Sequence, residues 1–441
     1  MKTQITFWGG LDTIGGNIAE VTYGNDRVIF DYGLVYNPAN AVMDAAGKRG
    51  KSRVLDLLKL DAIPRIDGVY SESSLQGPSY LIKKPVPEEK STYQTGVFIS
   101  HLHLDHIGVM DTISPNIPVY MTEGSKRLFH VLEQVGEGLP WKRTYTGMRY
   151  GESMKIGEIR VTAFPVDHDI IGAASYLIET PDQRILYSGD LRMHGAHPEY
   201  IQDWLNVMRE KEISMLLMEG TSFRPEQEEQ LTRLCKKEED IKPVAFSILK
   251  ETNGLALFNM YHRNVERIRY FIDAAREAGR IPILEWETAR IADEFINGAA
   301  FMIYREDEEG LPTCDLLEKY ESIGVEQINQ RPEKYLLQNS YHYIYRLLDL
   351  NLYDSVYLHA NGVPLGAFDP AYATMKVVLE KFGVSYKSLD VSGHATKEDV
   401  LHLIDQIKPK LLVPWHSHYP ELVMPLDEQQ EVLLPEKGKV Y

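Results

Sequence analysis

The sequence predicts an α/β protein built from more than one structural unit. Short apolar segments rich in β-branched and aromatic residues recur along the chain, and several of them end at a histidine or an aspartate. Strand and helix patterns alternate between residues 244 and 285, as expected of a parallel sheet covered by helices. With 441 residues, the chain is long enough for two or three domains and a large core.

The first predicted strand covers residues 4–8 and leads into a glycine-rich loop at residues 9–16. This loop lacks the GxGxxG spacing, and no strand, helix, strand unit follows it, so the sequence argues against a dinucleotide site. Residues 23–26 are typical of a turn between two strands, and the second of these strands leads to Asp31.

The most informative segment is the HxHxDH run formed by His101, His103, Asp105 and His106. It follows a predicted buried strand at residues 96–100, and strand ends are common ligand sites in α/β proteins. Neutral imidazole nitrogen and carboxylate oxygen suit Zn²⁺, and also Mn²⁺ or Fe²⁺. The four donors cannot all reach one ion, because two of them lie beyond the turn. The run therefore predicts two divalent metal ions.

Three further strand patterns end at a metal-ligand type of residue. His168 follows the alternating strand at residues 159–163, Asp190 follows the strand that begins at residue 185, and His416 ends an apolar segment. Each of these residues alone has an ordinary explanation as a capping or hydrogen-bonded side chain. Together they supply the donors that two ions need in addition to the HxHxDH run.

Taken in order, these motifs resemble those of metallo-β-lactamase-fold hydrolases of the β-CASP branch, close to ribonuclease J-like enzymes. The seven family motifs match Asp31, the HxHxDH run, His168, Asp190, Glu219, His394 and His416. The resemblance spans nearly the whole chain, and the occurrence of all seven motifs in order makes it specific.

The resemblance implies how the ligands are divided between the two ions. His101, His103 and His168 would hold one ion, Asp105, His106 and His416 would hold the other, and Asp190 would bridge them. Asp31 would orient a ligand through a hydrogen bond. Between two such cations a water loses its proton near neutral pH and can attack a phosphodiester, with Asp105 helping to orient it.

His394, flanked by Glu219, is the candidate proton donor for the leaving group, because a neighbouring carboxylate favours the protonated imidazole. Ser392, Gly393 and His394 are expected to bind a substrate phosphate through a hydroxyl, an unhindered N–H and the imidazole. The ordinary alternative is a strand-to-helix turn with Thr396 as the N-cap. A helix start is itself an anion site, so both interpretations are compatible.

The resemblance implies an αββα sandwich with an inserted β-CASP α/β domain. We expect residues 1–222 to form the first part of the sandwich, residues 223–384 the inserted domain, and residues 385–441 the return. The return follows from His416, because a ligand 226 residues after Asp190 requires the chain to come back to the first domain.

Within the expected insertion, residues 223–240 are acidic and polar and predict an exposed helix and linker. Residues 244–248 predict a strand, residues 262–279 an amphipathic helix that ends at a glycine, and residues 281–285 the next strand. His359, in a later strand, is expected to be an ordinary hydrogen-bonded histidine.

The composition limits the partners and the compartment. A net charge of −17 argues against a generally basic nucleic-acid surface, so local cations and the metal ions must bind phosphate. Residues 48–53 are one basic candidate, with a solvated loop as the alternative, and Arg192 and His194 are better placed beside Asp190. Two cysteines, no apolar run of ~18 residues and no signal-peptide pattern predict a cytoplasmic protein without a membrane segment.

The predicted function is a metal-dependent ribonuclease that cleaves single-stranded RNA internally, from a 5′ end, or both. The alternative is a hydrolase of DNA or of a small phosphorylated or acyl substrate on the same scaffold. By family resemblance, a histidine at residue 416 favours RNA, whereas the DNA-repair branch has an apolar residue there. His418, two residues after His416, is a competing candidate for the same ligand position. The sequence leaves open whether copies of the chain associate.

Overall fold

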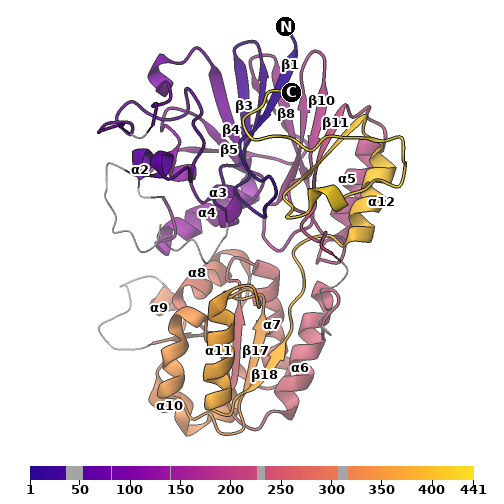
Figure 1. The fold of residues 1–441 in the computed structure, drawn as a ribbon. Coiled ribbons are helices and arrows are strands. Elements are labelled where there is room, and N and C mark those ends of the chain that lie inside the picture. Colours follow the sequence, from indigo (N-terminus) through magenta and orange to yellow (C-terminus); the bar gives the residue numbers. More distant parts are fainter. Residues whose placement is uncertain (36–52, 81, 140, 226–233, 306–315) are drawn as a thin grey trace.

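The computed structural model describes residues 1–35, 53–80, 82–139, 141–225, 234–305 and 316–441. Its strands form three sheets, two of which lie in one part of the molecule and the third in the other (Figure 1). The first sheet has the order β1 (Thr3–Phe7), β2 (Ala19–Tyr23), β3 (Asp26–Phe30), β4 (Gln94–Phe98), β5 (Val119–Thr122) and β6 (Tyr145–Met148).

The second sheet combines strands from both ends of the sequence. Its order is β20 (Glu431–Val432), β19 (Leu411–Trp415), β11 (Met215–Glu219), β10 (Arg184–Tyr187), β9 (Ala174–Glu179), β8 (Ile159–Pro165) and β7 (Ser153–Ile156). β19 pairs in parallel with β11, which sets Trp415 beside Glu219. The chain therefore returns to this sheet after the segment that forms the third one.

The first and second sheets pack face to face. Phe30 and Phe98 from the first sheet meet Tyr176 and Tyr187 from the second, with ring centroids 5.7 to 6.1 Å apart across the sheets. The outer faces carry helices: α4 (Glu123–Gln134) packs on β5 and β6, and α5 (Pro198–Arg209) packs on β8 and on α12 (Lys397–Ile407). These layers confirm the predicted αββα sandwich. The short helices α2 (Arg53–Lys59) and α3 (Leu104–Ile107) belong to the same part.

The third sheet is entirely parallel. Its order is β15 (Ser322–Ile323), β14 (Met302–Tyr304), β13 (Ile281–Leu284), β16 (Tyr335–Gln338), β12 (Ala256–Met260), β17 (Val356–Ala360) and β18 (Ser385–Ser388). The helices of this part are α6 (Ile241–Glu251), α7 (Val265–Glu277), α8 (Trp286–Phe295), α9 (Leu316–Lys319), α10 (Val325–Gln330) and α11 (Pro370–Lys381).

Two predictions for this part were wrong. Residues 244–248 lie inside α6, not in a strand, because their apolar residues continue a helical period in which Ile241, Ala245 and Leu249 are buried. Residues 234–240, expected to be exposed, bury Cys235 and Glu238 completely. The predicted amphipathic helix is confirmed as α7, which Asn264 caps through a hydrogen bond to the Arg267 N–H.

Ion pairs join the third-sheet part to the sandwich. Glu137, after α4, contacts Arg263 at 2.6 Å, and Arg127 on α4 contacts Glu294 on α8 at 2.5 Å. His197, before α5, contacts Glu266 on α7 at 2.9 Å. These contacts fix one part of the molecule against the other beside the strand ends described below. Among the described residues, no helix is both long and apolar enough to cross a bilayer.

Candidate metal centre

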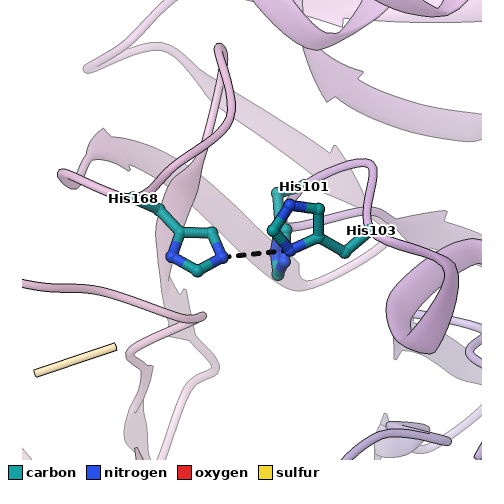
Figure 2. Close-up of side chains that lie close together, drawn as sticks. All are labelled: His101, His103 and His168. Atoms are coloured by element: carbon teal, nitrogen blue, oxygen red, sulfur yellow. Dashed lines mark hydrogen bonds between the residues drawn. The ribbon is translucent and has the colours of Figure 1, made fainter. Parts of the chain in front are cut away.

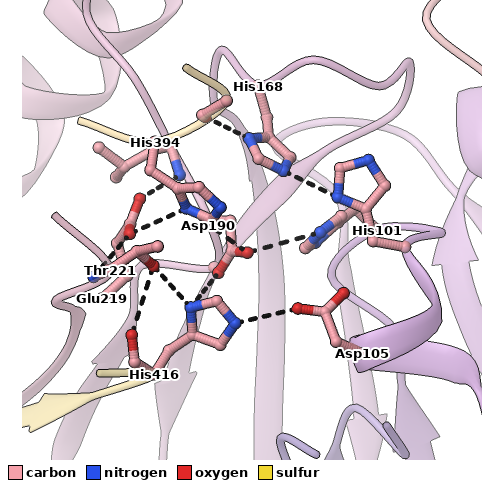
Figure 3. Close-up of polar contacts among 12 residues, drawn as sticks. His101, Asp105, His168, Asp190, Glu219, Thr221, His394 and His416 are labelled. Carbon is pink, nitrogen blue, oxygen red and sulfur yellow. Dashed lines mark hydrogen bonds and ion pairs between the residues drawn. The ribbon is translucent and has the colours of Figure 1, made fainter. Parts of the chain in front are cut away.

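The candidate ligands meet at the carboxyl-terminal ends of strands from both sandwich sheets (Figure 3). The HxHxDH run follows β4 and includes α3, whereas His168, Asp190 and His416 follow β8, β10 and β19. All these side chains except His103 and Asp105 are buried. The chain thus brings residues more than 300 positions apart into one site, because β8, β10 and β19 run in the same direction and end at one edge of the second sheet, beside the end of β4.

His101, His103 and His168 form the first donor group (Figure 2). One donor atom from each lies within 4.8 Å of the others, and His103 Nδ1 is 3.1 Å from His168 Nε2. His101 Nε2 is buried and has no hydrogen-bond partner among the described residues. Burial, followed by the neighbouring imidazoles, holds the pKa of His101 well below its usual value, and burial lowers the pKa of His103 to about 3. Both rings are therefore neutral, as metal ligands must be.

Asp105, His106, Asp190 and His416 form the second donor group. His106 Nε2 lies 3.1 Å from Asp190 Oδ2, and His416 Nε2 lies 3.1 Å from Asp105 Oδ2. Asp190 Oδ2 is also 3.7 Å from His101 Nε2 in the first group, so this carboxylate lies between the two groups. Its other oxygen is buried and lacks a hydrogen-bond partner within the described chain.

The donor set fits two divalent cations. Each group contains a buried atom without a hydrogen-bond partner among the described residues, His101 Nε2 in the first and Asp190 Oδ1 in the second, and such atoms are costly unless an ion or another partner satisfies them. Although burial alone would lower the pKa of His106, Asp190, Asp105 and Asp31 raise it well above its usual value. A metal ion must therefore displace a proton from this ring in order to bind. The neighbouring carboxylates favour a positive charge at this position, and a metal ion supplies one.

Asp31 lies behind the second group and holds its histidine in place. Its carboxylate accepts hydrogen bonds from the Ser100 N–H at 2.7 Å and the Tyr187 hydroxyl at 2.5 Å, and it lies 2.8 Å from His106 Nδ1. Accepting a hydrogen bond from the Nδ1–H leaves Nε2 of His106 facing Asp190. Asp31 itself has a positive φ of 57°, a conformation that is uncommon outside glycine and clusters at functional sites.

His394 and Glu219 form a pair at the edge of the two donor groups. His394 Nδ1 is 3.0 Å from Glu219 Oε2 and 3.8 Å from Asp190 Oδ2. Burial would lower the pKa of His394, but the two carboxylates raise it to about 10, so the ring is protonated near neutral pH. The structure thus places a protonated imidazole beside Asp190, the carboxylate that lies between the two donor groups.

Ser392 and Gly393 lie directly before His394 and close over the first donor group. Ser392 Oγ accepts the His394 N–H at 3.1 Å, and Gly393 O lies 2.5 Å from His168 Nδ1. A Cβ at Gly393 would come within 2.7 Å of Asp169 Oδ1 and 3.0 Å of His168 Cε1, so a larger residue would have to displace these two side chains. α12 follows, with Thr396 as its N-cap in a capping box, as in the ordinary interpretation of this segment.

Several other predicted residues lie outside the centre. His418 is exposed and is not in either donor group. His359 is buried between Asp390 at 3.0 Å and the Pro364 carbonyl at 3.2 Å, which confirms the expected hydrogen-bonded histidine. The basic patch at residues 48–53 lies outside the described residues except for Arg53, which pairs with Asp111.

Arg192 and His194 do not present free charges to a substrate. Arg192 is fully buried between Asp167 and Glu238, with contacts of 3.2 and 2.8 Å. His194 Nε2 lies 3.0 Å from the Ser392 carbonyl. Both residues lie close to the centre, as predicted. Their contacts, however, hold neighbouring loops together.

Two residues of the centre were missed from the sequence. Asp169 is 8% exposed and places Oδ1 3.4 Å from His168 Nε2; its position directly after a predicted ligand could have revealed it. Tyr261 comes from the third-sheet part and lies with its ring 5.2 Å from that of His103. No local pattern marks Tyr261, because only the packing of the two parts brings it there.

A cavity of about 450 Å³ adjoins the centre through Tyr261. It lies at the carboxyl ends of β12, β13 and β16 and is also lined by Glu285, Gln338 and Tyr341. After β12, the chain forms β13, β14 and β15 on one side of that strand. It later forms β17 and β18 on the other side. Open parallel sheets bind ligands at such a change of direction.

Comparison with known proteins agrees with this architecture. Residues 60–282, about half of the chain, match the profile described as the Beta-lactamase superfamily domain. A crystal structure described as a protein of unknown function from Enterococcus faecalis V583 is similar with a TM-score of 0.82 and 29% identity, covering 100% of both chains.

Curated relatives are similar over most of the chain. Ribonuclease J of Pyrococcus abyssi (strain GE5 / Orsay) is 24% identical over 443 residues, which cover 94% of this chain and 91% of the relative. Ribonuclease J of Mycoplasma genitalium is 23% identical over 95% of this chain and 68% of its own length. Ribonuclease J 2 of Streptococcus pyogenes serotype M3 is 23% identical over 97% of this chain and 72% of the relative.

Proposed function

The chain belongs to the beta-lactamase superfamily, and from this membership we propose that it is a metal-dependent ribonuclease acting on single-stranded RNA. The observation that carries the proposal is the pair of donor groups with Asp190 between them. Two adjacent cations suit a phosphodiester, whose non-bridging oxygens gain charge as the bond is cleaved. The curated relatives named ribonuclease J support RNA as the polymer.

In this proposal, His101, His103 and His168 would hold one ion, and Asp105, His106 and His416 would hold the other. Asp190, which lies between the two donor groups, would serve both sites, and Asp31 keeps His106 oriented through the 2.8 Å contact at Nδ1. When bound, the two ions, most simply zinc with manganese as the alternative, polarise the phosphate and lower the pKa of water. Asp105 Oδ2, 3.1 Å from His416, is placed to orient the attacking water.

The other residues of the centre act on the substrate. His394, protonated by its contact with Glu219, donates a proton to the leaving oxygen. The backbone of Ser392 and Gly393 lies over the first donor group, where an N–H can bind a phosphate oxygen. Tyr261 and the adjoining cavity support a substrate longer than one nucleotide, because aromatic walls stack bases without strict sequence preference.

We also propose that a β-CASP domain is inserted between residues 222 and 385 and that the sandwich resumes afterwards. β18 (Ser385–Ser388) still pairs with β17, so the return is better placed after residue 388. An RNA substrate makes the cytoplasm the proposed compartment.

The function is tested with 5′-labelled single-stranded RNA and DNA of the same sequence. RNA cleavage that is lost in a chelator and restored by Zn²⁺ or Mn²⁺ is expected, because ions held by the two donor groups would activate the attacking water. Mononucleotide release from a 5′-monophosphate end would indicate an exonuclease, and a ladder of fragments an endonuclease. Cleavage of DNA alone, or of neither polymer, would contradict the proposal.

The variant His394→Ala is expected to lower kcat by ~10²-fold or more while both ions stay bound. General acid catalysis contributes ~10²–10⁴-fold, and the His394 ring contacts the ligand Asp190 only at 3.8 Å. Turnover and metal content are measured on the same preparation. Loss of an ion from this variant would show that His394 is a ligand instead of a proton donor.

A further inference from the structure

A histidine that binds a metal through one ring nitrogen almost always donates the other N–H to an acceptor. In the first donor group, His168 has such a partner, since its Nδ1 lies 2.5 Å from Gly393 O. His101 also has one, because its Nδ1 lies 3.0 Å from Ser100 Oγ. These contacts leave Nε2 of both rings free to face an ion.

His103 is the exception in this group. Its Nδ1 lies 3.1 Å from His168 Nε2, close to the spacing of about 3.3 Å between two donors of a tetrahedral zinc. This nitrogen therefore faces the other ligands. The opposite nitrogen, Nε2, is buried and has no hydrogen-bond partner within the described residues.

Asp169 provides the acceptor that His103 lacks. Its Oδ1 lies 3.6 Å from His103 Nε2, and it too is buried without a hydrogen-bond partner among the described residues. Gly393 lies next to this oxygen, and its lack of a side chain leaves room for the carboxylate. The same oxygen lies 3.4 Å from His168 Nε2, but that nitrogen faces His103 Nδ1 at 3.1 Å and is directed to the ion. His103 Nε2 is thus the nitrogen that lacks an acceptor, and it faces Asp169 Oδ1 at slightly more than hydrogen-bond distance.

We propose that Asp169 is a positioning residue of the first metal site: it accepts the Nε2–H of His103 and so directs Nδ1 of that ring to the ion. The inference rests on the proposed metal centre. A movement of a few tenths of an ångström closes the contact, and the carboxylate then makes Nδ1 a stronger donor. Asp169 does not touch the substrate in this role.

The experiment compares zinc affinities of the wild-type chain, Asp169→Ala and Asp169→Asn by competition with a chromophoric chelator. Asp169→Ala is expected to weaken one of the two zinc sites by ~10–100-fold, the usual effect of removing such a partner. Asp169→Asn keeps the volume and an acceptor oxygen, so its effect should be smaller. A second readout is a slowly exchanging Nε2 proton of His103 in zinc-loaded, ¹⁵N-histidine-labelled protein, which Asp169→Ala should abolish.

Asp390→Asn is the matched control, because Asp390 is another carboxylate in contact with a buried histidine, His359, at 3.0 Å in the third sheet. Its zinc affinities should equal those of the wild type. Unchanged affinity and an unchanged Nε2 proton in both Asp169 variants would overturn the inference while leaving the metal centre in place. A wild-type chain that binds no zinc would overturn the proposed function as well.

Discussion

Replacing Asp190 by asparagine is expected to reduce RNA cleavage by ~10³-fold or more without unfolding the protein. Asp190 lies between the donor groups, with Oδ2 3.1 Å from His106 Nε2 in the second group and 3.7 Å from His101 Nε2 in the first. The amide keeps the side-chain volume but removes the negative charge between two cations. Metal ions supply several kcal/mol of transition-state stabilisation, and about 4 kcal/mol corresponds to ~10³ in rate. The measurements are kcat/KM and bound metal per chain.

Asp390→Asn again provides the comparison, since it makes the same chemical change at a carboxylate that follows β18 and contacts His359 in the third sheet. It should retain both ions and turnover, and both variants should show the thermal unfolding of a folded chain. Full cleavage activity in Asp190→Asn with two bound ions would contradict the bridging position assigned to this residue.

The candidate ligands could be found from the sequence because each belongs to a local pattern. A strand of four to seven residues followed by a donor within three residues can be recognised in a short stretch of sequence, as for β8 before His168 and β19 before His416. Their meeting is not local. It followed from the resemblance, together with the tendency of parallel strands to present ligand sites at one edge.

The errors arose where a short window allowed two interpretations. Residues 244–248 are apolar enough for a buried strand, but the burial of Ile241, Ala245 and Leu249 extends over two helical turns. β12 (Ala256–Met260), the central strand that follows, was not predicted, although all five of its residues are buried. A buried strand and a buried helix segment cannot be separated by periodicity over five residues.

Charged residues in the core escaped prediction for a different reason. An acidic segment such as residues 234–240 is normally solvated, and a single buried glutamate is recognised only through its partners. Those partners, Arg192 and Arg267, come from separate parts of the sequence. The same applies to Tyr261, which reaches His103 from another sheet.

Glu238→Ala is expected to lower the free energy of unfolding by about 3–5 kcal/mol, because it leaves two buried guanidinium groups without their shared carboxylate. Glu238 accepts hydrogen bonds from Arg192 Nη1 at 2.8 Å and from Arg267 Nη2 at 2.6 Å, and all three side chains are 0% exposed. Arg192 also reaches the carbonyls of His168 and Ser392, at 3.4 and 3.3 Å. Loss of the Glu238 carboxylate should therefore also loosen the loops of the metal centre. Urea unfolding measures the change in the free energy of unfolding.

The neighbouring residue supplies a matched control. The Glu239 side chain is 69% exposed and contacts Lys237 at 3.6 Å, so Glu239→Ala should change stability by less than about 1 kcal/mol. Glu238→Gln should lie between the two alanine variants, because the amide keeps an acceptor but not the charge. If Glu238→Ala unfolds at the same urea concentration as Glu239→Ala, the remaining contacts of Arg192 with Asp167 and of Arg267 with the Ala360 carbonyl would suffice to hold both guanidinium groups.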